Sequence, residues 1–410
     1  MSEKQRQALS FVLATLIALS VARFGYALYL VHSLGFGDFY LFWEQTLSFL
    51  DTGRLYPYTS LAAYEPGASV FKFPPLYAVF LIPPALAGVG HSIFDYHFAV
   101  QLTLYLAFVG MAVFMFRGRK PWLAAALIAI MSFSFEPFIE SIDVLQLEVP
   151  FLTLLTLCLF CFQRGKDGWA GALLGLCAML KIYPGFLLLF FVVRRRWRVV
   201  IAFGASAASL LIVNVLVVGL RETSVYYFEV LPVLLGETSI VTLENLGIGR
   251  YLQSLLGLGA GPAKALGTLA ALPFLVVSAL AVHANRDLRS RGNLAALEFS
   301  LFIPVMLLWM PNSWVNYQLL LLLPMAVVVG CSVATVRERA APLALVSAAY
   351  LLTLFSEMTM HSAYLLRLIW IPQPLLNTMI GFRVCSTLMV WAAVLLVLKA
   401  VSSEERTAAG

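Results

Sequence analysis

The chain has 410 residues, of which 61% are hydrophobic and only 12% are charged, and its mean hydropathy is +0.90. This composition excludes a water-soluble globular protein, because too little polar surface is available to cover a folded chain of this size. The net charge of +6 comes from short basic clusters between apolar runs, a pattern that is typical of loops in membrane proteins and does not indicate nucleic-acid binding.

Apolar runs recur from end to end without a long polar insertion, so we expect one integral membrane domain over residues 1–410. The first run, residues 9–31, follows a short basic segment and has no small-residue cleavage site after it, which indicates a retained membrane span. Because basic loops mark the cytoplasmic side, this span is expected to lead outward into a first outer loop, residues 32–97.

Two apolar stretches compete for the return crossing that must precede the basic cluster at residues 117–120. Stretch 73–90 contains two Pro-Pro pairs, which remove backbone donors that lipid cannot replace, whereas stretch 98–116 is unbroken. We therefore predict a span at 98–116. Stretch 73–90 is predicted to lie at the outer leaflet without crossing.

Segment 168–193 begins after one basic cluster and ends at another, so both of its ends are expected on the cytoplasmic side. A single crossing is then impossible, and the segment must turn at the outer side. The polar break KIYP at residues 181–184 is the place where the sequence allows this turn.

The remaining spans follow from the same alternation. Outward spans are predicted at 121–137, 168–181, 199–219, 295–311 and 341–357, and returning spans at 147–163, 184–193, 264–284, 315–335 and 379–399. The predicted fold is therefore an all-α polytopic membrane protein with about 12 transmembrane helices, outer juxtamembrane helices and both termini inside. A second outer loop is expected at 138–146 and a long outer segment at 220–263.

Polar residues collect at the outer face of this map. A charge at membrane depth costs on the order of 3 kcal/mol on insertion scales, so such a collection indicates a functional site. Asp38 lies just beyond the first span, where a carboxylate can stay ionised and act as a base. It could equally cap a helix that begins at Phe39. Lys72 and Lys181 could likewise be residues that snorkel to the membrane surface.

Two segments carry a resemblance to a known superfamily. The first outer loop reads GDFY at 37–40, TGRLYP at 52–57 and FKFPPL at 71–76, and it is similar to the first-loop signature of GT-C glycosyltransferases. WAGALLGLCAMLKIYP at 169–184, followed by RRRW at 194–197, shares this resemblance. Within GT-C the chain most resembles glycosyltransferase family 87, which comprises polyprenyl-phosphate-mannose-dependent α-1,2-mannosyltransferases, over residues 38–317.

The resemblance implies a GT-C-type fold and assigns roles to the outer residues. Asp38 matches the first-loop aspartate that acts as the base in an inverting single displacement. The leaving phosphate needs cations, for which Lys72, Lys181 and Arg250 are the candidates. The candidates for sugar and acceptor binding are Tyr56, Glu140, Asp143, Gln146, Tyr183, Asn245, Trp314, Asn316 and Tyr317. The resemblance places Glu140, Asp143 and Glu148 where metal-dependent GT-C enzymes hold an acidic motif. Because Glu140 and Asp143 do not form a tight Asp-x-Asp pair, we expect these acids to hydrogen-bond sugar hydroxyls, and we expect no metal and no other cofactor.

The sequence thus predicts a glycosyltransferase with its active site on the periplasmic side of a bacterial cytoplasmic membrane. Its donor is expected to be a sugar, mannose or another hexose or pentose, on a polyprenyl monophosphate, and its acceptor a glycolipid or lipid-linked glycan. The alternatives are a transporter or flippase of lipid-linked saccharides, and a polymerase or ligase of surface polysaccharide. A transporter should carry ionisable residues along both halves of its spans, whereas here they gather at one face.

Overall fold

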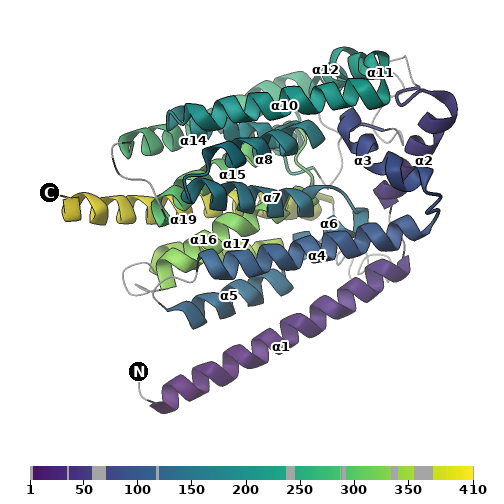
Figure 1. Cartoon of the computed structure of the whole chain (residues 1–410). Helices are drawn as coiled ribbons and strands as arrows, with labels where there is room; N and C mark the ends of the chain where they lie inside the picture. The colour runs from purple at the N-terminus through teal and green to yellow at the C-terminus, as the bar shows by residue number, and fades with distance from the viewer. Residues whose placement is uncertain are drawn as a thin grey trace.

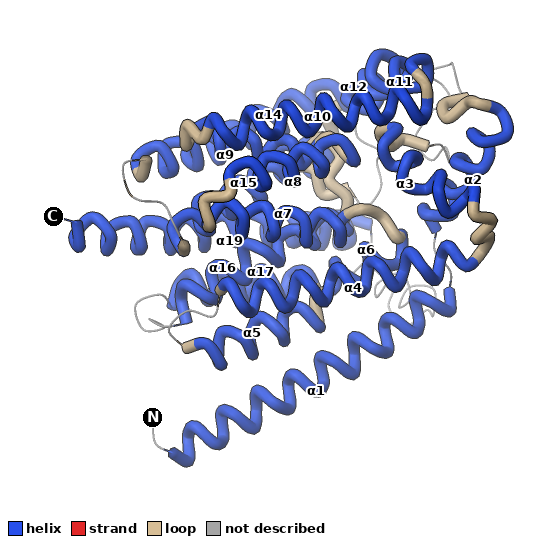
Figure 2. The backbone as a smooth tube through the Cα atoms, in the orientation of Figure 1, coloured by secondary structure: helices blue, strands red, loops and turns tan. Residues whose placement is uncertain are grey.

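The computed structural model describes residues 3–34, 37–57, 71–116, 120–236, 245–286, 288, 292–333, 340–354 and 373–409. Figure 2 shows helices joined by short connections throughout this part of the chain, and no strand is drawn within it. The prediction of an all-α protein is therefore confirmed.

The described helices follow one another along the chain. They are α1 (Glu3–Leu34), α2 (Gly37–Thr52), α3 (Pro75–Leu86), α4 (Ser92–Met115), α5 (Pro121–Phe133), α6 (Glu136–Val144), α7 (Glu148–Gln163), α8 (Asp167–Leu180), η2 (Tyr183–Leu187), α9 (Leu188–Val193), α10 (Trp197–Val218), α11 (Leu220–Val225), η3 (Tyr226–Val230), α12 (Leu231–Gly236), α13 (Ile248–Leu256), α14 (Ala260–Ala284), α15 (Asn293–Trp309), η4 (Val315–Leu321), α16 (Leu322–Ser332), α17 (Ala340–Thr353) and α19 (Gln373–Ala409).

The helices form one bundle in which both termini lie at the same end, on the left of Figure 1. Helices α2, α3, α11 and α12 gather at the opposite end, which we call the α2 end. Among the described residues, six helices are long and apolar enough to cross a membrane, or seven if the bent pair of α5 and α6 forms one span. The chain is therefore a multi-pass membrane protein.

The count of about 12 crossings stays a prediction. Six further helices within the described residues are apolar but shorter, between 10 and 17 residues: α3, α7, α8, η2 with α9, α15 and α17. Most of these helices coincide with predicted spans. The basic clusters at 117–119 and 289–291, and the later part of the predicted span 341–357, lie outside the described residues.

The Pro-rich stretch 73–90 forms the 12-residue helix α3, whereas its competitor forms the 24-residue helix α4. Pro75 occupies the first turn of α3, where a missing N–H costs nothing. By helical rise, α3 is about 18 Å long, too short to cross a bilayer of about 30 Å. This length agrees with the prediction that the stretch does not span.

The predicted break in segment 168–193 is also present. Helix α8 ends at Leu180, Lys181 is extended with φ −161° and ψ 128°, and η2 begins at Tyr183. Helix α8 packs closely against α10 at Gly171. Glycine is needed there, since a Cβ at this position would lie 2.3 Å from the backbone oxygen of Val199. This close packing fixes the direction from which Lys181 leaves α8.

Two elements form the centre of the bundle. Every residue of α15 from Leu294 to Leu308 is buried, as is every residue of α16. Segment η4, which leads into α16, is buried from Asn316 to Leu321. The predicted span 315–335 is therefore an interior element surrounded by protein, and its start lies at the candidate site.

The first outer loop is fixed to α11 by one buried carboxylate. Oε2 of Glu222, which is 4% exposed, accepts hydrogen bonds from the backbone N–H groups of Leu55 and Tyr56 at 2.9 and 3.0 Å. A buried N–H that loses its acceptor costs about 1–3 kcal/mol, so this contact stabilises the loop that follows α2.

We expect Glu222→Ala to lower the thermal unfolding temperature of the purified protein in detergent, because it leaves two buried N–H groups unpaired. Glu229→Ala is the matched control, since Glu229 is an exposed acid on the neighbouring η3. Equal unfolding temperatures for the two variants would show that Glu222 does not hold the loop.

Candidate active site

The side-chain amide of Gln146 joins two of the residues predicted to act in catalysis. Its Nε2 donates a hydrogen bond to Oδ2 of Asp38, and its Oε1 accepts one from Nζ of Lys181 at 3.1 Å. Nδ2 of Asn316 makes a longer contact of 3.5 Å to the same Oε1. We call Asp38, Gln146, Lys181 and Asn316 the Gln146 cluster. All four were expected at the site, and they come from four separate segments.

The local backbone explains how Gln146 reaches this place. Helix α6 ends at Val144, and the capping residue that follows it, Leu145, is left-handed with φ 48°, an uncommon conformation for a residue with a Cβ. Such strain persists only where the surroundings hold it, and it is frequent at functional sites. The backbone oxygen of Gln146 accepts a hydrogen bond at 2.8 Å from Nε2 of Gln101, a buried residue of α4. The turn between α6 and α7 is thus fixed on both sides of Gln146.

Asp38 lies in the first turn of α2, where the helix dipole stabilises a negative charge. The residue is partly exposed, so its carboxylate remains accessible from outside the bundle. The helix begins at Gly37, not at Phe39 as the capping alternative assumed. The carboxylate accepts a hydrogen bond from Gln146, 108 positions later in the chain. A residue that only capped its own helix would not need this contact.

Lys181 is surrounded by groups that favour a cation. Its Nζ donates to Oε1 of Glu148 at 2.8 Å and lies 4.2 Å from the ring centroid of Tyr317 and 4.9 Å from that of Phe73. The negative charge of Glu148 and the faces of the two rings all favour the charged form of this ammonium. Lys181 therefore stays protonated at the break between α8 and η2.

Buried polar atoms beside the cluster lack partners within the described residues. They are the hydroxyls of Tyr77 and Tyr183 and the second carboxylate oxygen of Glu148. Burial raises the pKa of Tyr77, and the charges of Glu148 and Asp38 raise it further, so its hydroxyl stays protonated. Because buried polar groups are normally hydrogen-bonded, these atoms are suited to contact a bound ligand. The ring of Tyr183 stacks on that of Tyr317 at 5.1 Å.

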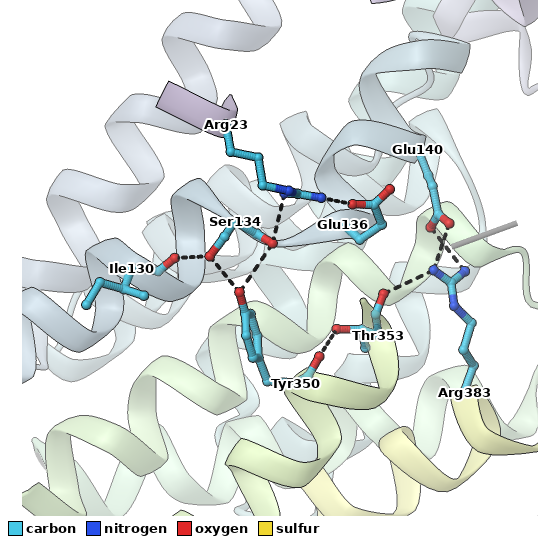
Figure 3. Close-up of polar contacts among 8 residues, drawn as sticks. All are labelled: Arg23, Ile130, Ser134, Glu136, Glu140, Tyr350, Thr353 and Arg383. Carbon is cyan, nitrogen blue, oxygen red and sulfur yellow. Dashed lines mark hydrogen bonds and ion pairs between the residues drawn. The ribbon is translucent and has the colours of Figure 1, made fainter. Parts of the chain in front are cut away.

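The role of Glu140 as a sugar contact stays a prediction, and the structure gives this acid a protein partner. Its two oxygens accept hydrogen bonds from Arg383 of α19 at 2.7 and 3.1 Å, and both side chains are buried (Figure 3). The carboxylate is thus committed to a helix 243 residues away in sequence. Asp143, on the same helix as Glu140, is half-buried and lies close enough to Asp38 for the two carboxyl groups to interact electrostatically.

Three other expected sugar contacts lie in structural connections. The hydroxyl of Tyr56 donates to the backbone oxygen of Phe73 at 2.6 Å. Oδ1 of Asn245 accepts from the N–H groups of Gly247 and Ser313, both at 3.0 Å, and Asn245 forms a backbone bridge with Trp314. The contact of Tyr56 joins two parts of the first outer loop. The contacts of Asn245 join the segment before α13 to the turn before η4.

The two remaining expected cations are Arg250 and Lys72. Arg250 is 6% exposed, and no hydrogen bond or ion pair among the described residues joins it to the Gln146 cluster. It lines a separate pocket with Lys264, Thr268 and Trp309, and its Nε has no partner within the described residues. Lys72 is half-buried and precedes Phe73, whose ring faces the ammonium of Lys181.

Tyr77 and Arg383 have evident roles but were absent from the expected site, and Glu148 was expected beside the sugar but not as the partner of Lys181. Glu148 begins the apolar helix α7, and Arg383 is an isolated charge within the apolar helix α19. An isolated charge inside an apolar run is a detectable signal of a paired or functional group, although it does not identify the partner. Tyr77 gives no comparable signal.

A second buried Arg–Glu pair involves none of these residues. Nε of Arg194 is 3.1 Å from Oε2 of Glu298, with both side chains buried. Arg194 also donates to the backbone oxygen of Asn285 at 2.8 Å, and Arg406 of α19 donates to the side chain of Asn285 at 2.9 Å. The expectation that charges gather only at one face is therefore incomplete.

Among the described residues, no three His, Cys, Asp or Glu side chains converge in a way that could hold a metal ion. The expectation of a metal-independent enzyme remains a prediction.

Comparison with known proteins identifies the family. The sequence model for glycosyltransferase family 87 matches residues 71–311, which is more than half of the chain. A comparison with curated protein sequences finds no match. One similar solved structure is the crystal structure of ArnT from Cupriavidus metallidurans bound to undecaprenyl phosphate, at 14% identity and a TM-score of 0.45, covering 96% of this chain and 78% of that one. On the family match, the chain belongs to glycosyltransferase family 87.

Proposed function

We propose that this glycosyltransferase takes a sugar from a polyprenyl monophosphate and transfers it to a glycolipid or lipid-linked glycan by an inverting single displacement. The observation that carries the proposal is the amide of Gln146, which binds the carboxylate of Asp38 at one end and the ammonium of Lys181 at the other. The same side-chain amide thus hydrogen-bonds to a base and to a cation. Such a displacement needs these two groups near the reacting carbon.

In this mechanism the acceptor hydroxyl loses its proton to Asp38 as its oxygen forms a bond to the anomeric carbon. The bond between that carbon and the phosphate oxygen breaks, and the phosphate leaves with the electron pair. Lys181 stabilises the charge that develops on the phosphate, in a pocket where the rings of Phe73 and Tyr317 reduce contact with water. Lys72 and Arg250 are proposed as further contacts of the carrier phosphate.

The sugar is proposed to be mannose or another hexose or pentose, held by polar groups around the cluster. Tyr183, Asn316 and Tyr317 are the expected contacts that lie beside Gln146, and Tyr77 adds an unpaired hydroxyl. We place the protein in a bacterial cytoplasmic membrane with the α2 end facing the periplasm. The distribution of basic clusters supports this orientation.

Transfer by the purified protein in lipid nanodiscs tests the activity. Polyprenyl phosphates carrying isotope-labelled mannose or a labelled pentose are supplied with lipid extract as acceptor, and products are analysed by mass spectrometry. We expect one donor to be consumed, with free polyprenyl phosphate and a labelled glycolipid as products. Movement of an intact lipid-linked saccharide between leaflets, without release of polyprenyl phosphate, would instead support the flippase alternative.

The proposed orientation predicts which sites an impermeant thiol reagent can reach in intact cells. In a variant whose incompletely buried cysteines, Cys161 and Cys385, are replaced by serine, Asp95→Cys should be labelled from outside and Lys120→Cys should not. Both native residues are exposed, and they lie near opposite ends of the bundle, at the start of α4 and before α5. Labelling of Lys120→Cys without labelling of Asp95→Cys would show that the protein has the opposite orientation in the membrane.

A further inference from the structure

Helix α6, which leads to Gln146, is held by ion pairs to two helices from opposite ends of the chain. Glu136 pairs with Arg23 of α1, and Glu140 binds Arg383 of α19 through both oxygens (Figure 3). The two acids are four residues apart and so share one face of α6. A bidentate pair between a guanidinium and a carboxylate fixes orientation as well as distance.

The same turn of α19 also holds η4, which carries Asn316 and Tyr317. Nε2 of Gln318 donates to the backbone oxygen of Arg383 at 2.8 Å, with longer contacts of 3.5 and 3.4 Å to the hydroxyls of Ser386 and Thr387. Arg383 is therefore in contact with α6 through its side chain and with η4 through its backbone.

A third contact lies just before Arg383. A Cβ placed at Gly381 would approach the ring of Tyr251 to 2.7 Å, so glycine allows α13 to lie directly against α19. Helix α13 carries Arg250 next to Tyr251. Residues 381–387 thus contact three of the segments that bear predicted site residues, namely α6, η4 and α13.

We propose that residues 381–387 of α19 form a positioning element for the active site, with Arg383 as its central residue. This element lies outside residues 71–311, which the family model matches. Arg383 acts through Glu140 and α6, whose following turn places Gln146 between Asp38 and Lys181. The effect on catalysis rests on the proposed function, whereas the effect on the turn does not.

The expected size of the effect follows from the geometry of catalysis. A displacement of about 1 Å at a reacting group can lower the rate by about 100-fold. Loss of the Glu140–Arg383 pair releases one side of α6 but leaves Lys181 bound to Glu148. We therefore expect kcat to fall more than the donor KM rises.

The test removes both charges together, because a single substitution would leave an unpaired charge buried. Buried ion pairs replaced by apolar residues of similar size often leave stability unchanged or increased. The test variant is Glu140→Met with Arg383→Met in the full chain. Arg194→Met with Glu298→Met is the matched control, since it removes the other buried Arg–Glu pair, which has no contact with α6 among the hydrogen bonds described.

Two measurements are made on each folded variant. Hydrogen–deuterium exchange is followed in peptides covering residues 143–149, and transfer kinetics are measured with polyprenyl-phosphate mannose as the probe donor. For the test variant we expect faster exchange in these peptides and a kcat reduced about 10-fold to 100-fold, with the donor KM within about twofold of wild type. The control variant should match wild type in both.

A folded test variant with wild-type exchange and wild-type kcat would overturn the proposal, as would faster exchange with unchanged kcat. If wild type transfers nothing from polyprenyl phosphates carrying mannose, another hexose or a pentose, the proposed function fails, and exchange alone then decides whether residues 381–387 order the turn. If the double variant does not fold, Arg383→Lys replaces it, because lysine keeps the charge but cannot bind both carboxylate oxygens in plane. Its exchange and kcat are judged by the same outcomes.

Discussion

Asp38→Asn is expected to reduce sugar transfer by about 100-fold to 10,000-fold, the usual cost of losing a general base. Asparagine has nearly the same shape as aspartate and can still hydrogen-bond the amide of Gln146 after one amide is turned around. The substitution therefore removes the proton acceptor while leaving the contact in place. Initial rates with the donor that wild type uses, at saturating donor and acceptor, measure the effect.

The matched control is Glu44→Gln, which neutralises an exposed acid on the same helix, α2. It should retain the wild-type rate and the wild-type unfolding temperature. Near-normal turnover by Asp38→Asn would remove Asp38 from the mechanism, and Asp143, the acid whose carboxyl interacts with that of Asp38, would become the next candidate base.

Much of the helix pattern could be predicted because it depends on local properties. The proline pairs in 73–90 predict an element that does not cross the membrane, and α3 has only 12 residues. The polar break at Lys181 interrupts an apolar run, and the helix ends there. In both cases the determining feature, a missing N–H group or an isolated charge, lies within the segment that it changes.

The site could be predicted only in part, because its contacts join distant segments. Gln146 and Lys181 were expected at the outer face as separate polar residues, and their hydrogen bond links positions 35 residues apart. Glu140 looks like a sugar ligand in the sequence because it is an acid near other acids. Its commitment to Arg383 depends on how α19 packs against α6, which no local pattern encodes.

The ion pair between Lys181 and Glu148 affects how a substitution of Lys181 alone can be interpreted. Lys181→Met keeps the apolar stem and deletes the charge, but it leaves the fully buried Glu148 without its ammonium partner. Removing one member of a buried ion pair typically destabilises a protein by about 3–5 kcal/mol. A loss of activity in this variant alone could therefore report unfolding and not the loss of a phosphate contact.

Lys181→Met combined with Glu148→Gln separates these effects and gives the second large prediction. We expect the double variant to recover most of the thermal stability that Lys181→Met loses, because glutamine carries no charge that needs a partner. We expect kcat/KM for the polyprenyl-phosphate donor to remain about 100-fold to 1,000-fold below wild type, since a fixed charge on the leaving phosphate is missing. Donor titrations in nanodiscs measure kcat/KM, and thermal unfolding of the same samples measures stability.

Lys72→Met is the comparison variant for this experiment, because Lys72 is the other lysine expected at the phosphate and precedes the aromatic ring that faces Lys181. A loss of kcat/KM in both the Lys72 and the double variant would indicate that the two ammonium groups share the phosphate. Wild-type kcat/KM in a stable double variant would show that Lys181 is a structural partner of Glu148. The phosphate would then bind elsewhere, and the pocket around Arg250 and Lys264 offers two alternative cations.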